Sequence, residues 1–225
     1  KRKQLKKRLK KLKLALLLGV TLSTNPKEIK ANSEQIELNV ESWGNPEYEI
    51  GMCETLNNLE EAIKCYLSEY GVRIVLLGGE NDADIIWQQD GDQLSSSIRG
   101  FTQIEEALID EDITIYVEAC RHSNYSPDNG MSSDEFNFRI ARGTLLHEIG
   151  HCLDGVTYFN LSYTSEFIQA FNEEAGNFKL TDTYNIENNR IDQNISSPEE
   201  YFATSFISYE TDKENLKEYC PKTTT

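Results

Sequence analysis

Histidine, tryptophan and methionine are scarce in this chain: its 225 residues include three His, two Trp and two Met. A long apolar run is also missing, because the apolar stretch 14–22 covers nine residues whereas a transmembrane helix needs about 20. The sequence therefore predicts no membrane-spanning helix. The shortage of histidine also means that an imidazole metal site has only His122, His147 and His151 to draw on.

The five cysteines form no recognisable framework. They are odd in number and no two have C-x-x-C spacing, which excludes a small domain stapled by disulfides. We expect one or two bridges at most, with Cys53 and Cys65 able to tie the two ends of one element. At least one thiol must stay free, and Cys152, beside His151, is expected to be the buried one.

Basic residues are few beyond the start of the chain. Nine of the first 13 residues are Lys or Arg, an apolar stretch follows, and Ala31 offers a small residue for cleavage. This order predicts a secretory signal peptide over residues 1–31, with a basic amphipathic helix on a membrane or nucleic acid as the alternative. The remaining residues carry 11 basic and 37 acidic side chains, a net charge near −26. Nucleic acid is therefore not expected as a partner, and the acidic surface suits a cationic substrate or serves solubility.

The chain beyond the signal peptide is long enough for one domain with its own core. We expect residues 32–50 to be a linker or irregular extension and residues 51–225 to fold as a single domain. Short β-branched runs come first and helical patterns follow, which predicts an α+β fold with a small mixed sheet packed beside helices. The expected strands are 72–77, 82–89 and 113–119, and the expected helices are 54–70, 102–109, 134–153, 164–176, 198–209 and 213–219.

The chemistry is concentrated in the run His147-Glu148-Ile149-Gly150-His151, inside one predicted helix. Histidines four residues apart project from one helix face, so His147 and His151 can reach a single ion. Glu148 is turned from His147 by about 100°, which lets it approach water at the ion without ligating the metal. Zinc lowers the pKa of water to about 7, and a carboxylate takes the proton. The pattern therefore predicts a zinc-dependent peptide hydrolase with Glu148 as general base and acid.

A catalytic zinc needs a third protein ligand and one open position. No histidine follows His151, and His122 is interpreted as a solvated loop residue or a substrate contact. The ligand is therefore expected to be a carboxylate, and two sites compete: Glu173 in one predicted helix and Glu200 at the start of the next. The run 197–200 (SPEE) also fits a capping box, which alone would explain Glu200.

Two blocks of the sequence resemble a known family. HEIGHCLD (147–154) followed by PEEYFATSF (198–206) is similar to the catalytic domain of anthrax lethal factor and the related Pro-Pro endopeptidases. That family pairs H-E-[FI]-G-H-x-x-D with a later E-[YF]-F-A-x-x-F, whose leading glutamate completes the zinc site. The resemblance implies a zincin-like catalytic domain in which Glu200 is the third ligand. It also implies either cleavage of surface proteins at Pro-Pro bonds or toxin activity like that of lethal factor.

Three positions around these blocks matter for the resemblance. The family places a tyrosine seven residues before the ligand glutamate, where its hydroxyl stabilises the oxyanion of the reaction. Gln193 holds that position here, so the resemblance implies a catalytic role for Tyr184 further upstream, or for the amide of Gln193 itself. Thr204 stands where the family often has a second acid. Asp154 matches the family's aspartate and is either a hydrogen-bond partner of a ligating imidazole or only a polar residue before the helix stop at Gly155.

Together these patterns predict an exported zinc metalloendopeptidase that is secreted or retained at the cell surface. We expect a monomer that acts on a protein or peptide substrate. Residues 113–119 are the expected edge of the substrate cleft, where a peptide would add as a strand, and Trp87 is expected in the cleft or the core. The rival hypothesis is a secreted module that binds zinc but is catalytically weak or inactive.

Overall fold

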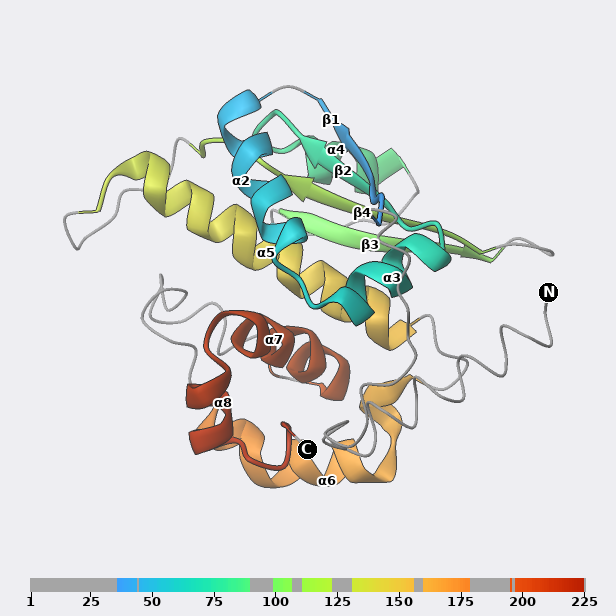
Figure 1. Cartoon of the computed structure of the whole chain (residues 1–225), viewed down its shortest axis with the longest axis vertical. Helices are drawn as coiled ribbons and strands as arrows, with labels where there is room; N and C mark the ends of the chain where they lie inside the picture. Colours follow the sequence, from blue (N-terminus) through green and yellow to red (C-terminus); the bar gives the residue numbers. More distant parts are fainter. Residues whose placement is uncertain are drawn as a thin grey trace, which may run out of the picture.

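The structure is a computed structural model of the chain. It describes residues 36–43, 45–89, 99–106, 111–122, 131–155, 160–178, 195 and 197–224. These residues form one four-stranded mixed sheet with helices on both faces, and Figure 1 shows the long helix α5 between the sheet and the C-terminal helices. The predicted α+β class is therefore confirmed. The expected signal peptide, residues 1–31, lies outside the described residues.

The sheet places its strands in the order β1-β2-β4-β3. Strands β1, β2 and β4 run parallel to one another, whereas β3 is antiparallel to β4 and ends the sheet. Their bounds are Asn39–Ser42 for β1, Arg73–Leu77 for β2, Gly100–Glu106 for β3 and Glu111–Glu118 for β4.

Seven α-helices accompany the sheet in the described part of the chain. Their bounds are Pro46–Asn57 for α2, Glu61–Glu69 for α3, Asp82–Gln89 for α4, Ser133–Gly155 for α5, Ser165–Glu174 for α6, Pro198–Thr211 for α7 and Lys213–Tyr219 for α8. Two 3-10 turns, Leu161–Tyr163 (η1) and Ala175–Asn177 (η2), flank α6. No helix within these ranges has both the length and the apolar character needed to cross a bilayer.

The core divides between the two faces of the sheet because successive strand residues point to opposite sides. In β2, Ile74 and Leu76 belong to the large cluster with α2, α3 and α5, whereas Val75 and Leu77 pack with α4. A third cluster joins α6, α7 and α8 around the fully buried Tyr201. Helix α5 therefore packs against the sheet and also against α7, whose Phe206 and Ile207 belong to the same cluster as Leu145, Leu146 and Ile149.

Helices α5 and α7 approach each other closely at a pair of small residues. A Cβ atom placed on Gly150 would lie 2.7 Å from the Cα atom of Ala203 and 3.1 Å from its carbonyl oxygen. No side chain fits in that space, so the glycine lets the two backbones meet. This contact brings the first half of α7 beside the C-terminal part of α5.

Two predicted elements have the wrong type. Residues 82–89 form a helix rather than a strand, since Ala83, Ile86 and Trp87 recur at helical spacing and pack on the sheet. Residues 100–106 form strand β3, whereas 102–109 was expected to be a helix. There the antiparallel pairing with β4 decides the conformation, and that pairing is invisible in the local pattern.

The start of the domain is also more regular than expected. Residues 39–42 form β1. Helix α2 begins at Pro46, whose fixed φ angle suits the first turn of a helix. The helix expected over 54–70 is two helices, with a break at residues 58–60. All five cysteines are free thiols in the structure, and Cys152 is fully buried as expected.

Candidate active site

The two motif histidines lie one turn apart on α5 and face the same point. The Nε2 atoms of His147 and His151 are 3.0 Å apart, and their rings meet edge to face at 89°. Both side chains remain partly exposed, with side-chain exposed fractions of 16% and 24%. Two imidazole nitrogens this close suit a shared cation between them.

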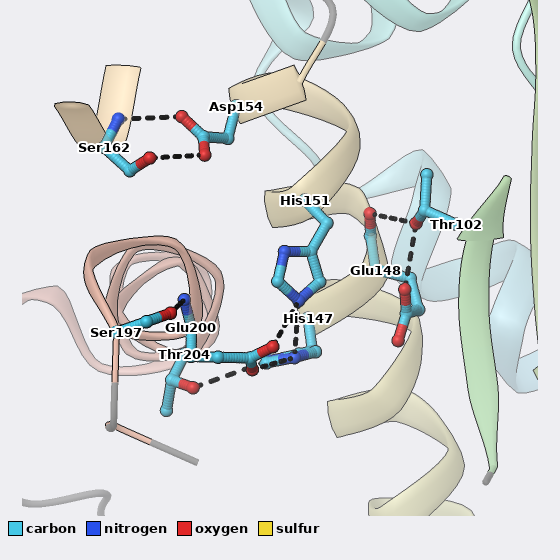
Figure 2. A network of polar contacts seen from close by, with 9 residues as sticks. All are labelled: Thr102, His147, Glu148, His151, Asp154, Ser162, Ser197, Glu200 and Thr204. Atoms are coloured by element: carbon cyan, nitrogen blue, oxygen red, sulfur yellow. Dashed lines mark hydrogen bonds and ion pairs between the residues drawn. The ribbon is translucent and has the colours of Figure 1, made fainter. Parts of the chain in front are cut away.

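Glu200 comes to these histidines from the first turn of α7. Its Oε2 atom lies 3.2 Å from Nε2 of His147, and its Oε1 atom lies 3.5 Å from Nε2 of His151. Ser197 caps the helix, because its hydroxyl accepts a hydrogen bond from the backbone N–H of Glu200 at 3.4 Å. The cap therefore uses the Glu200 backbone, while the carboxylate points toward the imidazoles (Figure 2).

These three donors fit a divalent zinc ion. Zinc bonds of about 2.0–2.2 Å at tetrahedral angles put neighbouring ligand atoms about 3.3–3.5 Å apart. The shortest separations between the three side chains are 3.0, 3.2 and 3.5 Å, and the last two end on different oxygens of Glu200. Across the described ranges, His147, His151 and Glu200 are also the one group of metal-binding side chains whose donor atoms all lie within 4.8 Å of one another.

The electrostatics of the site keep the Glu200 carboxylate ionised. Burial opposes its charge, but hydrogen bonds with His147 and His151 lower the pKa of Glu200 to about 2. Burial also disfavours a charged His151, yet its contact with Glu200 leaves the pKa of His151 raised. The carboxylate is therefore available as an anionic donor at neutral pH.

Glu148 lies beside this group but outside it. The residue is buried, with 6% exposed, and its carboxylate points to the sheet side of α5 (Figure 2). The single proton of the Thr102 hydroxyl is shared between the Oε2 atom and the main-chain oxygen of Glu148, each at 2.9 Å. Burial raises the pKa of Glu148, against the opposing effects of the two histidines and of the Thr102 hydrogen bond. A carboxylate with a raised pKa can accept a proton and later give it up.

Two further polar residues support α5 at the site. The Oγ1 atom of Thr204, one turn after Glu200 on α7, lies 3.5 Å from Nδ1 of His147. Asp154 is buried and accepts hydrogen bonds from the backbone N–H and the hydroxyl of Ser162, each at 2.7 Å. Asp154 therefore fastens η1 to the end of α5.

The competing carboxylate and the third histidine lie elsewhere. Glu173 is on α6, where it pairs with Lys222 and accepts a hydrogen bond from Gln169 at 2.7 Å. His122 is not a solvated loop residue, because only 8% of it is exposed. Its Nε2 atom lies 3.1 Å from the buried Glu118 carboxylate. The sequence analysis missed that interaction because it placed Glu118 in a strand and His122 in the loop that follows.

The structure tests some of the remaining predictions about the site, and others concern residues outside the described ranges. Tyr184 and Gln193, the candidates for stabilising the oxyanion, lie outside the described residues. The expected cleft edge, 113–119, is wrong, because β4 is paired on both sides by β2 and β3. Trp87 packs edge-on against Phe101 at 5.0 Å and belongs to the core on the α4 face.

Thr102 is the residue of the site that sequence reasoning missed. It was assigned to a helix, and no motif marks it. The alternation of Phe101, Thr102 and Gln103 in a strand beside α5 could have pointed to it only with the pairing of β3 known.

Comparison with known proteins identifies a family and a related fold. The sequence model of the family described as "Anthrax toxin lethal factor, N- and C-terminal domain" matches residues 45–225. No curated protein matches the chain. Among solved structures, the chain resembles the Pro-Pro endopeptidase PPEP-2 from Paenibacillus alvei, with 21% sequence identity and a TM-score of 0.53. That likeness covers 82% of this chain and 93% of the other, and it concerns the fold.

The family match spans the blocks 147–154 and 198–206 and all the helices and strands from α2 onward. It confirms the resemblance inferred from those blocks and the expected enzyme class, a metalloendopeptidase. The chain belongs to the anthrax toxin lethal factor family.

Proposed function

We propose that this chain is a zinc-dependent endopeptidase in which His147, His151 and Glu200 hold the metal and Glu148 moves the protons. The observation that carries the proposal is the triangle of three donor atoms with a buried carboxylate on the adjoining residue. Zinc held there would supply Lewis acidity, which acidifies water and polarises the peptide carbonyl.

The residues of the chain have separate tasks in this proposal. Glu148 accepts a proton from the attacking water and then donates it to the leaving amine. Burial raises the pKa of Glu148, which favours acceptance of the proton. Oxyanion stabilisation is assigned to Tyr184, with the Gln193 amide as the alternative.

The substrate is proposed to be an extended peptide that lies along β3. This strand ends the sheet, and it lies directly beside α5 at Glu148. A peptide added to its outer edge would gain backbone hydrogen bonds and would pass the metal ligands. The similarity to PPEP-2 makes peptides containing Pro-Pro the first sequences to test, and a toxin-like substrate is the alternative.

The location of the enzyme and the bounds of its domain are inferred from the sequence. Residues 1–31 are proposed to direct export, and residues 51–225 are proposed to form one domain, to which β1 and the start of α2 add part of 32–50. Export would place the strongly acidic enzyme outside the cell or at its surface, where it would act as a monomer.

The test is hydrolysis of a mixed peptide library, read by mass spectrometry, with the zinc content measured on the same sample. The proposal expects one equivalent of zinc, cleavage at defined bonds, and loss of cleavage with chelator that is restored by added zinc. One equivalent of zinc without cleavage of any peptide would favour the rival zinc-binding module. Absence of bound zinc after dialysis against zinc-containing buffer would overturn the metal site itself.

A further inference from the structure

Strand β3 presents every second residue to helix α5. A Cβ atom on Gly100 would lie 2.6 Å from a Thr144 side-chain carbon and 3.3 Å from Cγ of Glu148. Two residues further on, Thr102 contacts Glu148, and Ile104 reaches Gly155 at the end of the helix. This period of two is that of a strand with one face on the helix.

The close approach depends on the glycine. A Cβ atom on Gly100 would also lie 2.8 Å from the main-chain oxygen of Tyr116, so the position has no room for a side chain. The strand is therefore fixed at a distance from which a side chain as short as threonine reaches the carboxylate of Glu148.

The geometry points to Thr102 as a positioning residue for the Glu148 carboxylate, an inference that rests on the proposed function. The hydroxyl lies 2.9 Å from both Oε2 and the main-chain oxygen of the same residue, and its one proton is shared between them. These two contacts tie the end of the side chain to its own backbone through one hydroxyl. The other carboxylate oxygen, Oε1, is not held by this hydroxyl and can receive a proton.

Such a tether is needed because the carboxylate must stay off the metal. A glutamate side chain has three rotatable torsions before its carboxylate, and unrestrained it can turn toward the nearby cation site. The Thr102 hydroxyl holds it on the sheet side of α5, as Figure 2 shows. The edge strand would thus bind substrate on its outer side and restrain the general base from its helix-facing side.

The test compares Thr102→Val, which keeps the shape and removes the hydroxyl, with Thr102→Ser, which keeps the hydroxyl. The valine variant should lower kcat by roughly ten- to a hundredfold, since small misplacements of a catalytic group carry such penalties, while KM and zinc content stay unchanged. The serine variant should keep most of the wild-type kcat. Thr114→Val on β4 makes the same chemical change one strand away and serves as the matched control.

Two results would overturn the assignment. One is an equal loss of kcat in the valine and serine variants, which would indicate that Thr102 acts through packing alone. The other is a wild-type kcat in the valine variant. A crystal structure of Thr102→Val with zinc provides a readout independent of turnover, and the Glu148 side chain should adopt another rotamer there. An unchanged rotamer would reject the tether even if no peptide is cleaved by any form. Absence of cleavage by wild-type protein together with a changed rotamer would instead reject the proposed function and keep the tether.

Discussion

The Oε2 atom of Glu200 lies 3.2 Å from Nε2 of His147, although the two residues belong to different helices, α7 and α5. A capping role alone does not require this contact, because Ser197 caps α7 through the Glu200 backbone N–H. The carboxylate is thus free to serve the metal site. Three donors from two helices leave one position open for water, as a catalytic zinc requires.

Removal of the Glu200 carboxylate should therefore weaken zinc retention strongly. Glu200→Ala leaves two imidazoles, and we expect the zinc affinity to fall by at least two orders of magnitude, by analogy with the 10–100-fold losses from outer-shell changes. Glu173→Ala is the matched control, because that carboxylate pairs with Lys222 on the surface of α6. Competition titration with a chromogenic chelator measures both variants. A greater loss in the Glu173 variant would move the third ligand to α6.

Glu148→Ala should retain zinc and lose turnover. The side chain lies outside the donor group, so its loss should leave the zinc content near one equivalent. Without its proton transfers, kcat should fall by about 10²–10⁴-fold. Glu135→Ala, an exposed glutamate at the start of the same helix, is the control and should behave as wild type. Unchanged turnover in Glu148→Ala would refute its role as the base.

Gly150→Ala should destabilise the protein. The added methyl group would lie 2.7 Å from Cα of Ala203, so the backbones of α5 and α7 would have to separate. We expect a loss of about 1–3 kcal/mol, as for other overpacked cores. Gly176→Ala is the control, since its added methyl meets nothing within 4 Å. Urea denaturation of the two variants checks this, and equal midpoints would show that the helix contact can adapt.

The buried carboxyl group of Glu210 should make the stability of the folded protein depend on pH. Its burial and the nearby Glu60 raise the pKa of Glu210 from 4.5 to about 7, although Lys213 and Arg142 oppose the shift. Its Oε1 atom is buried without a hydrogen-bond partner within the described ranges. The folded state holds this proton more tightly than the unfolded chain. Its stabilising effect is therefore complete below pH 4.5 and is lost as the pH rises through 7.

Replacement of Glu210 by the uncharged glutamine should remove this loss of stability at high pH. Glu210→Gln should have a higher urea midpoint than wild type at pH 8, with the difference shrinking toward pH 4.5. Glu214→Gln on α8 changes an exposed glutamate and should show no such trend. A difference between Glu210→Gln and wild type that does not vary with pH would contradict the assignment.

The residues that come together at the site could largely be predicted from the sequence. One helix contains His147, Glu148 and His151, and the helical period alone determines which of these side chains share a face. Glu200 was found through the second block of the family motif, and the structure does bring it to the histidines. Both signals are local runs of a few residues, so no knowledge of the tertiary fold was needed.

The predictions that were wrong or missing concern residues whose structure depends on contacts with distant parts of the chain. Residues 82–89 are too short for periodicity to separate a helix from a strand, and packing on β2 and β4 decides for the helix. The burial of His122 requires Asn137 of α5, whose side chain accepts a hydrogen bond from the His122 backbone N–H. Thr102 matters only because β3 pairs with β4 in one register. The burial of His122 and the role of Thr102 leave no trace in a local window.

The division of the ligands between α5 and α7 also has a mechanical consequence. An ion that binds all three side chains cross-links the helix fastened to the sheet with the helix that anchors the C-terminal cluster. Part of its binding free energy would then appear as resistance of α6, α7 and α8 to local opening. Chelation would consequently expose those helices to proteolysis sooner than the strands.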